Sequence, residues 1–358
     1  MKNIFSKYFL AANSGEGFVS HFADNYDYTD GWHAYIIKGG PGTGKSSFMK
    51  YVAVNAVDKG YGVELCPCSS DPDSLDGVII KEKKIIILDG TAPHVVEPKF
   101  AGICEEIVNL GKFWNGEKLR KKANEIIAIT AQNKKLHKMA AAYISAAGEL
   151  IYDNFKLSKN FTKHNKCEKF AHNLALQLFP GKTGRIPCEW VRFIGGVTPK
   201  GVIAFKSTVE DFYKNIIVID DKHGAATNII MQKIRDMALD KGYEIITLKN
   251  PFLPSKIIDH ILVPELSLAV VREYDYIKWS EPYRRIHARR FYDINLLREC
   301  RSRLTFNRRV TRELLLGAVE TLGKAKAVHD ALEKYYIDSM DFKSMTLFAE
   351  QKAEEILK

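Results

Sequence analysis

The chain has no long apolar run, and this absence argues against a membrane-spanning helix. Its longest uncharged, apolar-leaning stretch runs from Met139 to Gly148, about half of the roughly 20 residues that cross a bilayer. The first apolar segment, Tyr8 to Ala12, is too short for the core of a secretory signal. We therefore expect a cytoplasmic protein that makes no contact with membranes.

Cysteine is scarce and irregularly spaced, so neither a disulfide framework nor a zinc site is predicted. The six cysteines include one close pair, Cys66 and Cys68, and a lone C-x-C pattern is a poor indication of metal binding. We expect all the thiols to be reduced, as in a cytoplasmic protein.

The richest chemistry lies in a glycine-rich segment near the N-terminus. A strand predicted at 34–37 precedes the segment, and apolar residues at helical spacing follow it. Backbone N–H groups of such a loop close around phosphates, while its lysine and hydroxyl reach the β- and γ-phosphates and Mg²⁺. The segment fits the phosphate-binding pattern G-x-x-x-x-G-K-[ST] and reads Gly39-Gly40-Pro41-Gly42-Thr43-Gly44-Lys45-Ser46.

A second element of a nucleotide site is Asp89, which follows the buried strand predicted at 85–88. An aspartate at the end of such a strand, downstream of a P-loop, is expected to hold Mg²⁺ together with Ser46. Many ATPases place a glutamate directly after this aspartate to polarise water, but Gly90 stands here. Weak substitutes are His94, Glu97 and the acidic cluster Asp71, Asp73 and Asp76.

The reaction is left open by the missing glutamate. One hypothesis is slow or regulated hydrolysis of ATP, and another is a P-loop kinase whose small-molecule or nucleotide acceptor brings its own nucleophile. A third is a nucleotide-gated binder of nucleic acid or protein without significant turnover. ATP is favoured over GTP, because the nearest match to the guanine-binding Asn-Lys-x-Asp pattern, residues 165–168, follows no predicted strand.

The chain also repeats itself at a spacing of 182 residues. Residues 58–61, Asp-Lys-Gly-Tyr, recur at 240–243. Further along the chain the spacing is larger, and His137 is matched with His329. The second copy of the loop, residues 221–228, has lost the lysine and the hydroxyl, and Arg272 stands where the first copy has Asp89. We therefore predict one nucleotide site per chain, in the first half.

The repeat predicts two α/β domains, residues 1–183 and 184–358, each with a parallel sheet followed by helices. The helical parts are expected at 99–178 and 288–358, and residues 179–188, rich in Pro and Gly, are the best linker. A chain of 358 residues with 46% hydrophobic and 27% charged residues suits two such domains.

Arginine is almost absent from the first half, where residues 1–180 contain only Arg120, but ten arginines lie within 284–312. Three interpretations remain open. The segment provides an arginine finger for the γ-phosphate, binds nucleic acid or another polyanion as the net charge of +10 favours, or is an ordinary solvated face. The candidates for a finger are Arg284, Arg285, Arg289 and Arg290.

With these motifs the chain resembles the P-loop NTPase superfamily, and more closely a poorly characterised bacterial family of tandem P-loop ATPases whose second half is degenerate. The resemblance rests on residues 39–47, on residues 88–96 and on the repeat. It implies a tandem duplication of a P-loop NTPase-like sheet unit. It also implies binding of Mg-ATP by the loop, with Ser47 adding to Gly42, Gly44, Lys45 and Ser46.

Overall fold

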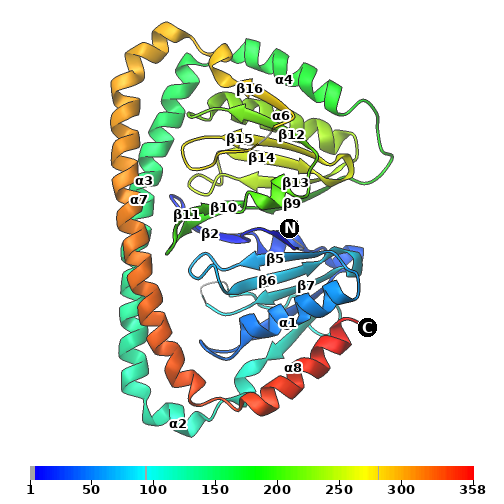
Figure 1. Ribbon diagram of the computed structural model, residues 1–358, viewed down its shortest axis with the longest axis vertical. Coiled ribbons are helices and arrows are strands. Elements are labelled where there is room, and N and C mark those ends of the chain that lie inside the picture. Colours follow the sequence, from blue (N-terminus) through cyan, green and yellow to red (C-terminus); the bar gives the residue numbers. More distant parts are fainter. Residues whose placement is uncertain (1–4, 93–94, 281) are drawn as a thin grey trace.

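The protein is built from two six-stranded mixed sheets, each followed along the chain by helices (Figure 1). This computed structural model describes residues 5–92, 95–280 and 282–358. The α/β class expected from the sequence is confirmed. The sheets lie one above the other, and two long helices run along the side of both (Figure 1).

The first sheet departs from the expected parallel arrangement at one strand, β6. In spatial order its strands are β1 (Phe5–Lys7), β5 (Val63–Pro67), β6 (Leu75–Ile80), β7 (Ile85–Asp89), β4 (His33–Lys38) and β8 (Glu105–Asn109). β6 is antiparallel to β5 and β7, and the other neighbouring pairs are parallel. The short connections on both sides of β6 explain this, because a tight turn joins only antiparallel strands. The expected helix from residue 99 is also wrong, since β8 comes first.

The second sheet has the same strand order and the same pairing directions. Its strands are β9 (Cys188–Arg192), β13 (Glu244–Lys249), β14 (Ile258–Val263), β15 (Leu268–Glu273), β12 (Asn215–Asp220) and β16 (Arg284–His287). Each sheet has a neighbouring hairpin, formed by β2 (Ala11–Ser14) with β3 (Gly17–Ser20) and by β10 (Gly195–Thr198) with β11 (Gly201–Ala204). This agreement is consistent with a duplicated α/β unit.

The facing sides of the two sheets share one hydrophobic core. It includes Ile86 and Leu88 of the first sheet and Leu262 of the second. Phe9 and Phe193, which match in the repeat, exchange two backbone hydrogen bonds of 2.9 Å each. Because each residue both donates to and accepts from its counterpart, the two halves meet as a pseudo-twofold pair.

The outer face of each sheet is covered by one helix from each half of the chain. These helices are α1 (Lys45–Asp58) and α8 (Phe342–Ile356) on the first sheet, and α6 (Ala225–Asp240) and α4 (His164–Leu178) on the second. Met345 and Ala349 of α8 pack with Met49 of α1. The predicted ranges 1–183 and 184–358 thus each contain one sheet, but their last helices are exchanged.

Two long helices, α3 (Ala123–Phe161) and α7 (Ile294–Ile337), form an antiparallel pair that spans both sheets (Figure 1). Asn115 N donates to Ser339 O at 2.7 Å, and Asp293 N donates to Phe161 O at 2.6 Å. These matched bonds relate positions 178 residues apart, so the expected match between residues 137 and 329 is wrong. No helix among the described residues, α3 and α7 included, contains a stretch apolar enough to cross a membrane.

Short helical turns complete the chain. They are η1 (Phe22–Asn25), η2 (Tyr28–Asp30), η3 (Lys81–Lys83), η4 (Leu110–Phe113), α2 (Gly116–Lys121), α5 (Ser207–Glu210), η5 (Pro264–Leu266) and η6 (Ala288–Phe291).

Candidate functional site

The glycine loop, residues 39–44, connects β4 to α1 as the sequence predicts. Gly42 and Gly44 have φ angles of 66° and 85°, a left-handed conformation that glycine adopts without strain. The loop therefore turns sharply and begins α1 at Lys45. Backbone N–H groups at a helix start carry partial positive charge, which suits an anion.

Lys45 lies across the glycine loop and next to the end of β7. Its Nζ donates to Gly39 O at 3.0 Å and to Gly40 O at 2.9 Å. The same Nζ lies 3.6 Å from Asp89 Oδ2. β4 and β7 are parallel neighbours, with Ile37 opposite Asp89, so their carboxyl ends meet here. The structure thus brings the two main predicted residues, Lys45 and Asp89, together.

Oxygen donors suited to a divalent cation gather at the same edge. Ser46 Oγ accepts from Leu75 N at 3.0 Å, which ties this hydroxyl to the start of β6. Asp76 follows Leu75 and directly precedes Gly77, which pairs with Leu88, the residue before Asp89. Hydroxyl and carboxylate oxygens are hard ligands, and Mg²⁺ is usually held by one or two carboxylates, substrate phosphates and water. The donor set therefore fits Mg²⁺, although the described residues contain no group of three or more His, Cys, Asp or Glu side chains that could hold a metal ion together.

The other predicted loop residues have mainly structural contacts or face solvent. Thr43 is buried, and its Oγ1 donates to Gly40 O at 2.8 Å. Pro41 lies within the loop, whereas Ser47 is exposed on α1. Glu97 accepts a 2.6 Å bond from Lys38 Nζ, so its carboxylate is already paired. The remaining candidate, His94, lies outside the described residues.

The four arginines proposed as fingers do not lie at the glycine loop. Arg284 and Arg285 lie on β16, the strand next to β12 in the second sheet, and Arg289 and Arg290 follow in η6 (Figure 1). Arg285 pairs with Glu273 at 3.0 Å. A pseudo-twofold pairing of the two halves was expected to bring these arginines, which follow the last predicted strand of the second half, near Lys45. The arginines instead remain with their own sheet, and a helix end from α7 reaches the loop.

Sequence reasoning missed three side chains that cover the glycine loop, Glu333 and Tyr336 of α7 and Met345 of α8. Gly42 N donates to Glu333 Oε1 at 3.2 Å. A Cβ at residue 40 would lie 2.9 Å from Cε1 of Tyr336, and one at residue 44 would lie 2.6 Å from Cε of Met345. The loop glycines thus also permit close helix packing. Gly42 and Glu333 are 291 positions apart, and no local pattern signals their contact.

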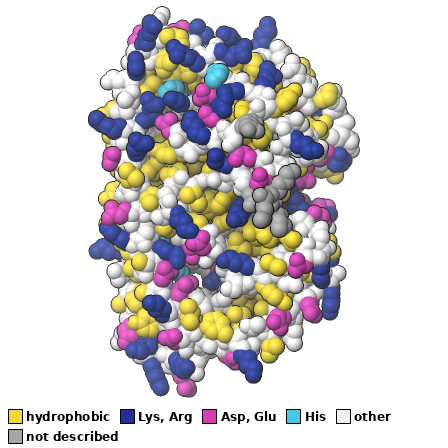
Figure 2. Space-filling view, viewed as in Figure 1, with side chains coloured by type: hydrophobic (Ala, Val, Ile, Leu, Met, Phe, Trp, Pro, Cys, Tyr) yellow, Lys and Arg dark blue, Asp and Glu magenta, His cyan; other side chains and the backbone are white. Residues whose placement is uncertain are grey.

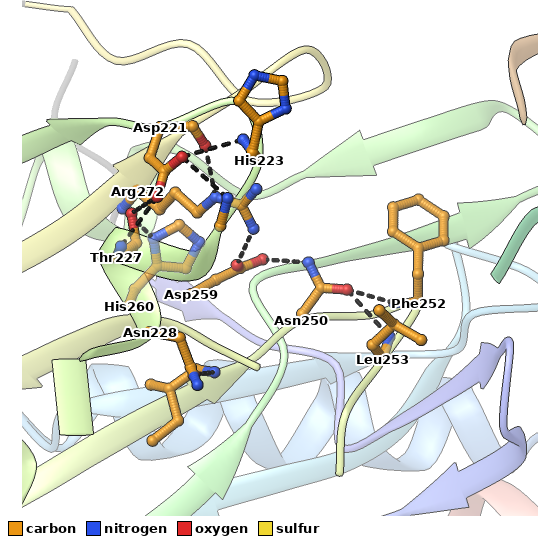
Figure 3. Close-up of polar contacts among 12 residues, drawn as sticks. Asp221, His223, Thr227, Asn228, Asn250, Phe252, Leu253, Asp259, His260 and Arg272 are labelled. Carbon is orange, nitrogen blue, oxygen red and sulfur yellow. Dashed lines mark hydrogen bonds and ion pairs between the residues drawn. The ribbon is translucent and has the colours of Figure 1, made fainter. Parts of the chain in front are cut away.

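The matching loop of the second half, residues 221–224, is closed by its own carboxylate (Figure 3). Asp221 Oδ1 accepts from the backbone N of His223 at 3.0 Å and of Gly224 at 2.9 Å, and Oδ2 accepts from Thr227 N at 2.9 Å. Burial raises the pKa of Asp221, but the charge of Arg272 and these hydrogen bonds outweigh burial and hold the pKa below its usual value. Three backbone N–H groups of this loop and of the start of α6 are therefore already satisfied.

In the second half, a buried ion pair stands at the positions that two carboxylates, Asp76 and Asp89, occupy in the first half. Arg272 Nη1 lies 2.8 Å from Asp259 Oδ1, and its Nε donates to Asp221 O at 2.8 Å (Figure 3). These residues match Asp89 and Asp76 of the first half, where the same two positions carry like charges. Like charges close together in a sheet are destabilising, and in the first half the Lys45 ammonium lies 3.6 Å from Asp89.

Comparison with protein-family models, curated proteins and solved structures found no match to this chain. Any function must therefore be argued from the site itself.

A small cavity lies above the closed loop of the second half. It measures about 60 Å³ and is lined by Lys222, His223, Arg308 and Thr311, among others. Small-molecule sites usually measure roughly 300–1,000 Å³. This cavity is therefore too small for a nucleotide.

Proposed function

We propose that the protein binds one Mg-ATP per chain at the glycine loop and is a P-loop ATPase of low or regulated turnover. In this proposal the chain is a tandem duplication in which the second half has lost its nucleotide site. The observation that carries the proposal is the placement of Lys45, which lies across the loop carbonyls and 3.6 Å from Asp89. The closed second loop supports it, because a protein carboxylate there occupies the place proposed for phosphate.

The roles of the residues follow from their positions. The N–H groups of residues 42–46 would bind phosphate oxygens, and the ammonium of Lys45 would neutralise the β- and γ-phosphates. Ser46 and Asp89 would hold Mg²⁺, with Asp76 beside them. When bound, the metal would supply positive charge to the phosphates.

The low turnover follows from what surrounds Asp89. Gly90 follows Asp89 in the chain. The Oδ1 atom of Asp89 accepts from Thr91 N at 2.9 Å and from Thr91 Oγ1 at 2.6 Å. The nearby Glu97 is engaged by Lys38. With glycine after Asp89 and Glu97 held by Lys38, slow hydrolysis is expected, and an acceptor hydroxyl of a kinase substrate would be an alternative nucleophile.

Asp89→Asn is expected to weaken ATP binding about tenfold in Mg²⁺ but less than twofold in EDTA, since it removes a charge and keeps the shape. Calorimetric titration of ATP with and without Mg²⁺ measures the difference. Asp30→Asn is a matched control, because Asp30 forms an exposed pair with Lys84 at 2.8 Å. Equal losses under both conditions would assign Asp89 only to holding the Thr91 turn.

A second candidate function, binding of single-stranded nucleic acid, is favoured by a basic face of α7. One side of this helix presents Arg298, Arg301, Ser302, Thr305, Phe306 and Arg309. Phe306 is 53% exposed, which leaves its ring available for base stacking beside the guanidinium groups. Lys and Arg side chains gather over the end of the molecule where α7 begins (Figure 2). This gathering suits a phosphate backbone.

Replacing Arg298, Arg301 and Arg309 together with alanine is expected to reduce the salt dependence of RNA binding. Three lost phosphate contacts lower the slope of log K against log salt by about 2 for a single strand. Fluorescence anisotropy with a labelled oligonucleotide measures the slope. Arg303→Ala is the control, because Arg303 is engaged by Asp153 at 2.7 Å. An unchanged slope in the triple variant would rule out this face of α7 as the binding surface.

A further inference from the structure

Near the C-terminal end of α7, the carboxylate of Glu333 contacts the glycine loop. Glu333 Oε1 accepts from Gly42 N, and the backbone of α7 is so close that a Cβ at residue 42 would lie 2.9 Å from Glu333 O. A hydrogen bond to the neighbouring His329 lowers the pKa of Glu333, and the charge of His329 and the Gly42 N–H add to this against the opposing effect of burial. A carboxylate therefore lies on an N–H group that a phosphate would use.

In the second half, a carboxylate also accepts from the matching loop N–H group, and there it is buried. Gly224 matches Gly42 in the repeat, and its N–H also donates to a carboxylate, that of Asp221. Asp221 comes from the loop itself, where the first half has Gly39. In both halves a protein carboxylate thus satisfies the same backbone N–H group.

The two carboxylates differ in how firmly they are held. Asp221 is 1% exposed and accepts from three backbone N–H groups and from Thr227 Oγ1 and the Tyr292 hydroxyl. The side chain of Glu333 is 35% exposed, and it accepts one loop N–H at 3.2 Å and pairs with His329 at 3.5 Å. Replacing Asp221 would break a buried network, whereas Glu333 can leave the loop by turning its side chain toward solvent.

We infer that Glu333 is an internal competitor for the phosphates of the nucleotide, so that ATP binding displaces Glu333 and loosens the end of α7 from the glycine loop. This inference rests on the proposed nucleotide site. A phosphate at the loop and the Glu333 carboxylate would accept from the same N–H group. Because both are negatively charged, they would also repel each other. Because α7 extends to the second sheet, the displacement links the nucleotide to the far half.

Glu333→Gln tests the inference, because glutamine keeps the size and loses the charge. It is expected to bind Mg-ATP about tenfold more tightly than the wild-type protein. Glu320→Gln is the matched control on the same helix, since Glu320 forms an exposed i,i+4 pair with Lys324 at 2.7 Å. Hydrogen exchange of residues 329–340 is the second readout, and Mg-ATP should speed it in the wild-type protein.

The outcomes separate the inference from the function on which it rests. Tighter binding by Glu333→Gln, with binding by Glu320→Gln unchanged, supports both. Equal affinities for Glu333→Gln and wild type, or slower exchange of the α7 end on ATP binding, overturn the inference and leave the nucleotide site standing. Absence of ATP binding by wild type and Glu333→Gln alike overturns both.

Discussion

Lys45→Ala is expected to lower the affinity for Mg-ATP at least tenfold, about 1.4 kcal/mol of binding free energy. The side chain provides the only ammonium that the described structure places across the glycine loop, with bonds to Gly39 O and Gly40 O. Without it, the β- and γ-phosphates would lose their direct positive partner. Isothermal titration calorimetry measures both the affinity and the number of nucleotides bound.

Lys50→Ala is the control for this change, because Lys50 lies on the same helix and its Nζ bonds Asp73 O at 2.6 Å. Its affinity should match that of the wild-type protein. Thr227→Lys should not create a second site, since Asp221 still occupies the N–H groups there. A stoichiometry of two, or full affinity in Lys45→Ala, would contradict the account.

Arg272→Met is expected to lower the free energy of unfolding by about 3–5 kcal/mol, the usual cost of breaking a buried ion pair by removing one partner. Arg272 and Asp259 are 4% and 0% exposed. The change leaves the Asp259 carboxylate without its cation and also removes the bond to Asp221 O. Urea unfolding followed by circular dichroism measures the loss.

Arg185→Met provides the comparison, because Arg185 forms a pair with Glu265 at 2.8 Å in which the arginine side chain is 65% exposed. Surface pairs of this kind contribute about 0–1 kcal/mol. If Arg272→Met were no more destabilising than Arg185→Met, the buried ion pair would not be an element that stabilises the second half.

Local features of the fold were predictable from the sequence, because they depend on neighbouring residues. The strand before residue 39, the sharp turn and the helix from Lys45 follow from apolar spacing and glycine. Apolar spacing does not predict β6, because Asp76 and Gly77 interrupt its pattern. Nor does it predict β8, because Glu105 to Asn109 have no strong β pattern.

The exchange of helices could not be predicted, because an apolar stripe shows that a helix is buried but not which sheet covers it. Cys167, Ala171 and Leu174 form such a stripe on α4, and its partner, Ile230, lies in the other half. The same limit applies to the candidate site. The sequence shows Asp221 in the degenerate loop, but it does not indicate that this carboxylate accepts hydrogen bonds from the backbone of the same loop.

A crystal structure with Mg²⁺ and a non-hydrolysable ATP analogue tests the central claim most directly. The account predicts one nucleotide per chain, with its phosphates on the N–H groups of residues 42–46, Lys45 on the β- and γ-phosphates, and the metal on Ser46 and Asp89. Phosphates found on the arginines of α7 or at residues 221–224, with the glycine loop empty, would contradict it.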